Sequence, residues 1–150
     1  MTEFTTPQDL VFNREAVTDP SGLAREADAA SWLFLCGEEF AAAGGLSYAE
    51  VQAAIPVAVN IPSDPPRVLD LDLARQQVAA LDELPRPTLV TCRSGPRASA
   101  VIYMYAGLRA GATAEQVLAR ADADDAPFCK VDDYRAWVTD CLAELSGPDA

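Results

Sequence analysis

The amino-acid sequence predicts a single α/β domain, in which helices flank a mainly parallel central sheet to give three layers. Two observations support this fold class. Short apolar or β-branched segments alternate along the chain with longer segments whose apolar residues recur at helical spacing. The length of 150 residues suits one compact domain, and no internal repeat is visible.

The strands are expected where apolar runs end at turn residues, with helices between them. Ser47 followed by Glu50 indicates a capping box, Thr113 indicates another helix start, and Gly107 or Gly111 suits the end of a helix beginning at Pro96. We expect strands at 10–17, 32–36, 57–61 and 88–92, helices at 21–31, 71–84, 96–111, 113–123 and 131–145, and a helical or irregular stretch at 37–54. Residues 1–30 are expected as an N-terminal extension, packed on the domain or partly disordered, and residues 31–150 as the catalytic domain.

The charge balance argues against nucleic-acid and anionic-membrane partners. The chain carries 23 acidic against 11 basic residues, a net charge of −12, whereas both partners require a basic surface. No apolar run approaches the roughly 18 residues of a spanning helix, and the first residues lack the basic and apolar regions of a secretory signal. We therefore expect a cytoplasmic protein.

The lack of histidine restricts the chemistry. It removes most zinc, copper and non-haem iron sites and every Ser-His or Cys-His dyad, so neither a metal nor an organic cofactor is expected. The four cysteines include no C-x-x-C pair and are expected to be reduced thiols. Cys129 and Cys141 are expected to be packing residues, whereas Cys36, at the end of another predicted strand, is a candidate resolving thiol for Cys92.

The ten residues TCRSGPRASA, 91–100, lie at a predicted strand-to-helix turn, where α/β folds place ligand sites. Cys92 would end the strand and Pro96 would begin the helix, so that backbone N–H groups surround one point at a helix N-terminus and stabilise a thiolate or a bound anion. Gly95 permits the tight turn, and Arg97 suits bidentate anion binding. The plain alternative is a strand end with an incidental buried cysteine. The expected substrate-binding residues are Arg93, Ser94, Gly95, Pro96, Arg97, Ala98 and Ser99.

These residues resemble those of a known superfamily. TCRSGPRAS is similar to the CRSGxRS-type loops of rhodanese-like sulfurtransferases, and IPVAVNIPSD is similar to a segment upstream of that loop. Downstream, AGLRAGATAEQVLARADADD resembles the beta-lactamase-hydrolase-like group, whose members are described both as phosphatase-like and as sulfurtransferases. The resemblance covers roughly Val57 to Asp125 and implies a rhodanese/cysteine-phosphatase-like fold.

Loop length separates the two chemistries of this superfamily. Cysteine phosphatases use C-x5-R, whereas Arg97 stands five positions after Cys92, which gives C-x4-R. The shorter loop resembles the cradle that rhodaneses build around a persulfide sulfur. Thr91 stands where phosphatases usually carry histidine. Asp64 in IPSDPP matches the place of their general acid, and it is equally compatible with a plain turn.

The sequence therefore favours a rhodanese-like sulfurtransferase. Cys92 would take sulfane sulfur from thiosulfate or a persulfide and pass it to a thiol acceptor, while Arg97, supported by Arg93, binds the anionic donor. The expected partners are a small anionic sulfur donor and a thiol acceptor. A protein is an alternative substrate. One alternative is a protein-tyrosine-like or dual-specificity-like phosphatase with Cys92 as nucleophile and Asp64 as acid. The other is a non-catalytic redox- or anion-sensing module.

Overall fold

The centre of the molecule is a four-stranded parallel sheet in the order β1-β4-β2-β3. The computed structural model describes residue 4, residues 7–63 and residues 68–145. The strands are β1 (Leu10–Phe12), β2 (Ser31–Phe34), β3 (Ala58–Asn60) and β4 (Thr88–Thr91). The predicted α/β class with a parallel sheet is confirmed.

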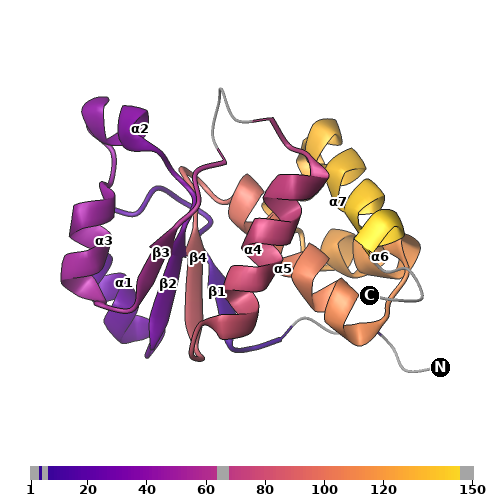
Figure 1. Cartoon of the computed structure of the whole chain (residues 1–150), viewed down its shortest axis with the longest axis horizontal. Coiled ribbons are helices and arrows are strands. Elements are labelled where there is room, and N and C mark those ends of the chain that lie inside the picture. The colour runs from indigo at the N-terminus through magenta and orange to yellow at the C-terminus, as the bar shows by residue number, and fades with distance from the viewer. Residues whose placement is uncertain (1–3, 5–6, 64–67, 146–150) are drawn as a thin grey trace.

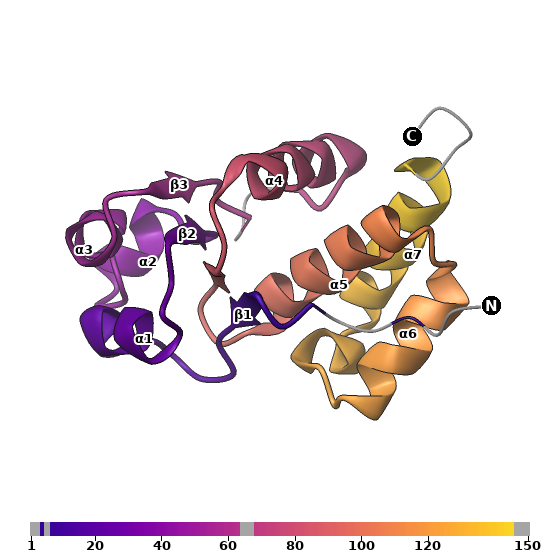
Figure 2. The ribbon, with the colours of Figure 1, turned by 90° about the horizontal axis from the view of Figure 1, so that it is seen from below.

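Helices cover both faces of this sheet, which makes the molecule three layers deep. The first three helices lie on one side of the sheet and the remaining helices on the other (Figures 1 and 2). The helices are α1 (Pro20–Glu26), α2 (Glu38–Ala42), α3 (Tyr48–Ala54), α4 (Leu71–Glu83), α5 (Pro96–Ala110), α6 (Ala114–Ala123), the 3₁₀ helix η1 (Pro127–Lys130) and α7 (Asp132–Leu145).

The two central strands are buried along their whole length. All four residues of β2 and of β4 are buried, as expected for parallel strands with helices on both faces, and this is why SWLF and TLVT read as uninterrupted runs. Trp32 in β2 donates its indole N–H to Thr91 Oγ1 in β4 over 2.8 Å. The two central strands are therefore tied together by a side chain at the point where β4 ends.

Helix α5 is the central helix of its layer. Every residue from Ala98 to Gly107 is buried, because the sheet lies on one side of this helix and α6 and α7 lie on the other. The helix ends at Ala110 and is capped by Gly111, whose φ of 68° is the left-handed conformation that favours glycine. The capping boxes predicted at Ser47–Glu50 and at Thr113 are both confirmed, the second with Gln116 as its partner.

The N-terminal segment departs most from the predicted elements. The strand expected over 10–17 ends at Phe12, because the side chain of Asn13 takes over the hydrogen bonding to the neighbouring strand. The helix expected over 21–31 ends at Glu26, and Asp28 (φ 50°) turns the chain into β2. Within residues 1–30, β1 is an edge strand of the central sheet, and α1 lies on one face of the sheet (Figure 1). Within the described ranges, no helix is long and apolar enough to cross a membrane.

Candidate active site

Cys92 directly follows β4 at the edge of the sheet where all the parallel strands end. Asn13 follows β1 at the same edge, and Leu35 follows β2, donating its backbone N–H to the carbonyl of Thr91 over 2.9 Å. Residues 93–95 form a short loop, and α5 begins at Pro96, its predicted first helical position. The structure thus places Cys92 between a strand end and a helix N-terminus, the usual place for a ligand site in open parallel sheets.

Two backbone N–H groups point at the sulfur of Cys92. The N–H of Gly95 donates to Sγ over 3.1 Å, and that of Ala98 donates to Sγ over 3.4 Å. Gly95 has φ 114°, so the predicted need for glycine at the tight turn is confirmed. Together with the N-terminal end of α5, these two donors stabilise negative charge on the sulfur. The loop therefore surrounds the sulfur with hydrogen-bond donors.

Asn13 fixes the backbone of Cys92, a role that no sequence pattern indicates. Its Nδ2 donates to the carbonyl of Cys92 over 2.9 Å, and its Oδ1 accepts from the N–H of Cys92 over 3.2 Å. A side-chain amide thus replaces the next rung of the β1–β4 ladder. The carbonyl of Asn13 also lies against Gly95, so that a Cβ at that position would collide with it. The loop is locked to β1 on both counts.

Arg97 lies at the start of α5 with its guanidinium over an aromatic ring. The centre of the guanidinium is 5.3 Å from the ring centroid of Tyr134, in the first turn of α7. The Nε of Arg97 is buried, and no hydrogen bond or carboxylate from the described residues engages this side chain. Arg93 is exposed and lies over the ring of Phe40 in α2, at 5.0 Å. Two arginines therefore flank the Cys92 loop, each on an aromatic side chain.

The remaining predicted residues take different places. Ser94 is exposed within the loop. Ser99 is fully buried, and its hydroxyl donates to the carbonyl of Pro96 over 3.1 Å and accepts from the N–H of Phe128 over 3.2 Å, which holds η1 against α5. Asp64, the candidate acid, lies outside the described residues. In the described ranges, no three cysteine or carboxylate side chains gather to hold a metal ion.

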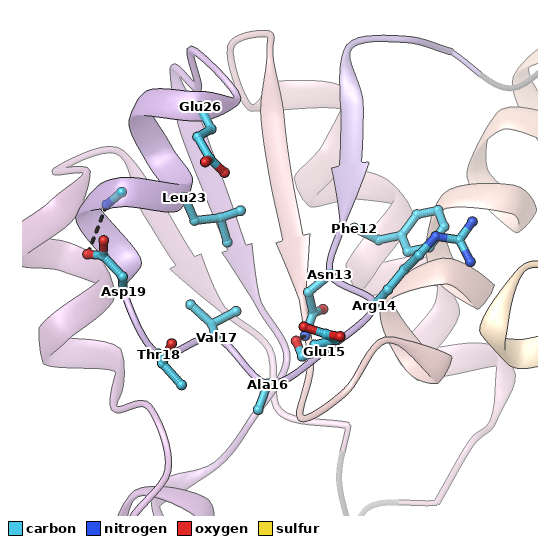
Figure 3. Close-up of a pocket in the computed structure, with 11 residues that line it drawn as sticks. Phe12, Asn13, Arg14, Glu15, Ala16, Val17, Thr18, Asp19, Leu23 and Glu26 are labelled. Carbon is cyan, nitrogen blue, oxygen red and sulfur yellow. Dashed lines mark hydrogen bonds between the residues drawn. The ribbon is translucent and has the colours of Figure 1, made fainter.

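A pocket of about 440 Å³ adjoins the loop through Asn13. The segment between β1 and α1 forms it, and Figure 3 shows Val17, Leu23 and Glu26 turned toward this space while Arg14 points away. Arg14 is held elsewhere, because it donates to the backbone carbonyls of Asp124 and Asp125. The lining of the pocket is thus part apolar and part acidic. Its lining consists of Phe12, Asn13, Arg14, Glu15, Ala16, Val17, Thr18, Asp19, Gly22, Leu23 and Glu26.

The other cysteines differ from Cys92 in their surroundings. Burial, with Asp122 next in importance, raises the pKa of Cys129 to about 11. Burial, followed by the charge of Asp140, raises the pKa of Cys141 to about 12. Both side chains therefore stay protonated near neutral pH, and Cys141 is a packing residue of the core, as predicted. Cys36 is also buried, at 1% exposure.

Comparisons with solved structures identify the fold. The chain superimposes on a candidate phosphatase from Neisseria meningitidis with a TM-score of 0.68 at 11% identity, covering 94% of this chain and 99% of that one. The core catalytic domain of the PP-IP phosphatase SIW14 from S. cerevisiae, solved with citrate, gives 0.63 at 13% identity and covers 94% and 83%.

A third similar structure comes from P. aeruginosa. Its protein TpbA gives a TM-score of 0.57 at 19% identity over 91% of this chain and 86% of that one, and a cysteine-to-serine variant of TpbA has been solved in complex with pTyr. This chain shares their fold. No protein-family model and no curated protein sequence matches it.

Proposed function

We propose that this protein is a cysteine-dependent phosphatase that acts on phosphate monoesters. The observation that carries the proposal is the pair of N–H groups, from Gly95 and Ala98, that point at the sulfur of Cys92. They are placed to bind negative charge on the sulfur, the atom that attacks phosphorus in this reaction, in a chain that has no histidine. The likeness of the fold to phosphatases supports this reading over the sulfurtransferase that loop length favours.

The proposed reaction proceeds in two displacement steps. The Cys92 thiolate attacks phosphorus, a P–S bond forms, and the bond from phosphorus to the ester oxygen breaks. The leaving oxygen takes a proton from a general acid, for which Asp64 is the candidate. Water then attacks the cysteinyl phosphate, releasing inorganic phosphate and restoring the thiolate. Arg97 binds the phosphoryl oxygens, because its donors are not engaged by any described carboxylate.

A sulfurtransferase is the second candidate, and the spacing of the loop favours it. Arg97 follows Cys92 by five positions, one fewer than in C-x5-R phosphatases, so the cradle is shorter. In this reaction the thiolate attacks the sulfane sulfur of thiosulfate, an S–S bond forms, and sulfite leaves. An acceptor thiolate then takes the outer sulfur from the Cys92 persulfide, which restores the cysteine thiolate.

The two candidates are separated by substrate and by the adduct on Cys92. We would measure hydrolysis of p-nitrophenyl phosphate by the wild type, by Cys92→Ser and by the matched control Cys129→Ser. The expected result is hydrolysis that Cys92→Ser abolishes and that Cys129→Ser retains. The mass of the protein would also be measured before and after thiosulfate treatment.

Three other outcomes would contradict the phosphatase. A reducible gain of one sulfur on Cys92, without phosphate release, would identify a sulfurtransferase. Hydrolysis that survives in Cys92→Ser would show that Cys92 is not the nucleophile. No turnover with either substrate, together with intact anion binding, would identify a sensing module. Asp64→Asn separately tests the acid, because loss of the proton donor to the leaving oxygen should lower turnover.

A further inference from the structure

Tyr134 brings an aromatic ring to the Cys92 loop from a distant part of the chain. Its ring lies under the guanidinium of Arg97, 5.3 Å from centroid to guanidinium centre, and its side chain interacts electrostatically with both Arg97 and Cys92. The residue belongs to the first turn of α7, which is anchored by Trp137, whose indole N–H donates to the carbonyl of Asp70 over 2.9 Å. The ring is therefore a fixed platform beside the loop.

Among the described residues, no hydrogen-bond acceptor engages the donors of Arg97. A guanidinium carries five N–H donors, and the aromatic ring of Tyr134 offers no oxygen or nitrogen acceptor to pair with them. A carboxylate partner would instead occupy two of these donors. An arginine side chain has many rotamers, and the ring of Tyr134 packs against the guanidinium of Arg97 in the one observed here.

The phenol of Tyr134 is also neutral under ordinary conditions. Burial raises the pKa of Tyr134, while the charge of Arg97 opposes that rise. The hydroxyl therefore adds no negative charge that would repel a bound anion. No described residue forms a hydrogen bond with this hydroxyl, which is consistent with a role for the ring alone.

We propose that Tyr134 is a positioning residue that holds the guanidinium of Arg97 over the Cys92 loop for bidentate binding of an oxyanion. The proposal rests on the proposed function, since it explains how the anion clamp of that site is held. It predicts that the aromatic ring matters and the hydroxyl does not. A cation–π contact of about 0.5–1 kcal/mol corresponds to a change of about two- to fivefold in anion affinity.

The test measures anion binding without requiring turnover. Inorganic phosphate is titrated against the rate at which iodoacetamide alkylates Cys92, followed by the mass of the labelled peptide, in the wild type, Tyr134→Phe and Tyr134→Leu. We expect phosphate to protect the wild type and Tyr134→Phe equally. Tyr134→Leu should need about two to five times more phosphate, and its KM for p-nitrophenyl phosphate should rise while kcat stays close to that of the wild type.

The matched control is the second arginine-on-tyrosine stack of α5, in which Arg109 lies 5.4 Å from the ring of Tyr105. Tyr105→Leu should lower stability and leave phosphate protection unchanged, so it separates loss of folding from loss of positioning. Equal protection in Tyr134→Leu and the wild type would overturn the proposal while leaving the phosphatase intact. So would a large loss of kcat in Tyr134→Phe, because the hydroxyl would then take part in the chemistry. If turnover is missing but protection weakens only in Tyr134→Leu, the proposed reaction fails and the positioning role stands.

Discussion

Helix α5 carries an arginine that lies over a tyrosine ring near each of its ends. Among the described residues, a carboxylate binds the arginine near the C-terminal end of the helix but not the one near its N-terminal end. Near its C-terminus, Arg109 lies over Tyr105 at 5.4 Å, and near its N-terminus, Arg97 lies over Tyr134 at 5.3 Å. The C-terminal stack is closed by a carboxylate. Asp82 Oδ1 accepts from the Nε of Arg109 over 2.9 Å and from the hydroxyl of Tyr105 over 2.7 Å.

The N-terminal stack lacks such a carboxylate among the described residues, and its buried Nε has no partner there. The chain has 23 acidic residues against 11 basic ones, so composition alone would readily supply a carboxylate partner for each arginine. The lack of one at Arg97 among the described residues therefore comes from the local structure. The same ring contact therefore serves two purposes. With Asp82 it completes an internal network, and without a carboxylate it leaves a guanidinium ready for an external anion.

The largest expected effect is a loss of catalytic activity when Arg97 is replaced, compared with no loss when Arg109 is replaced. Arg97→Ala should lower kcat/KM for p-nitrophenyl phosphate by roughly 10²-fold, because an electrostatic partner of the transferred group is lost. Arg109→Ala should leave kcat/KM unchanged and reduce the unfolding free energy by about 0.5–1 kcal/mol, the range for a half-exposed ion pair. Steady-state kinetics and urea unfolding check both. Equal kinetic effects of the two variants would erase the difference between the stacks.

The second largest effect is expected from Asn13, whose side chain holds the backbone of Cys92. Asn13→Ala removes both hydrogen bonds to the backbone of buried Cys92, which leaves an N–H and a carbonyl without partners. We expect a loss of about 2 kcal/mol in unfolding free energy and slower alkylation of Cys92 by iodoacetamide, because the loop loses its link to β1. Val11→Ala, in the adjoining strand β1, is the control for a simple loss of strand packing. It should lower stability and leave the alkylation rate of Cys92 unchanged.

The fold and the Cys92 loop could be predicted because both depend on neighbouring residues. Alternating strand and helix patterns imply parallel pairing, and CRSGPR carries its thiol, its turn glycine and its helix-starting proline within six positions. Asn13 could not be predicted in this way. It lies 79 positions from Cys92, and the contact depends on β1 pairing with β4, which the sequence does not specify.

Two further residues show the same limit. Tyr134 reads as one more residue of an amphipathic helix, and only the packing of α7 on α5 brings it to Arg97. Ser99 reads as a substrate hydroxyl because it follows the loop, yet its hydroxyl is used inside the protein to hold η1, an element that the sequence analysis did not anticipate. Its role as a substrate contact stays a prediction.

A smaller effect is expected in the rate at which Cys92 is alkylated, compared with Cys129 and Cys141. Near pH 7, iodoacetamide should label Cys92 at least about tenfold faster than Cys129 or Cys141, because only the thiolate reacts and the pKa values of the latter two are raised to about 11 and about 12. Peptide mass mapping after brief labelling checks this order. Faster labelling of Cys129, the half-buried one, would mean that exposure and not the Cys92 loop decides reactivity.

The smallest effect is expected on the unfolding free energy when Asp82, the carboxylate that binds Arg109 and Tyr105, is replaced. The hydrogen bond from Arg109, and then that from Tyr105, lowers the pKa of Asp82 below its ordinary 3.8. A carboxyl group whose pKa is lower in the folded state contributes stability above its unfolded pKa and loses it as the pH falls through the folded value. Asp82→Asn should therefore be less stable than the wild type by under about 1 kcal/mol near pH 7, since the pair is partly exposed.

This difference should shrink as the pH falls below the ordinary value of 3.8, because the wild type then loses the same interaction by protonation. Urea unfolding of both proteins at several pH values between about 7 and about 2.5 measures the trend. A gap that stays constant would show that Asp82 acts through packing and not through its charge. Near pH 7, phosphate protection of Cys92 should be the same in Asp82→Asn and the wild type, because the carboxylate of Asp82 contacts Arg109 and Tyr105 near the C-terminal end of α5. A change in protection would mean that the two ends of the helix are coupled.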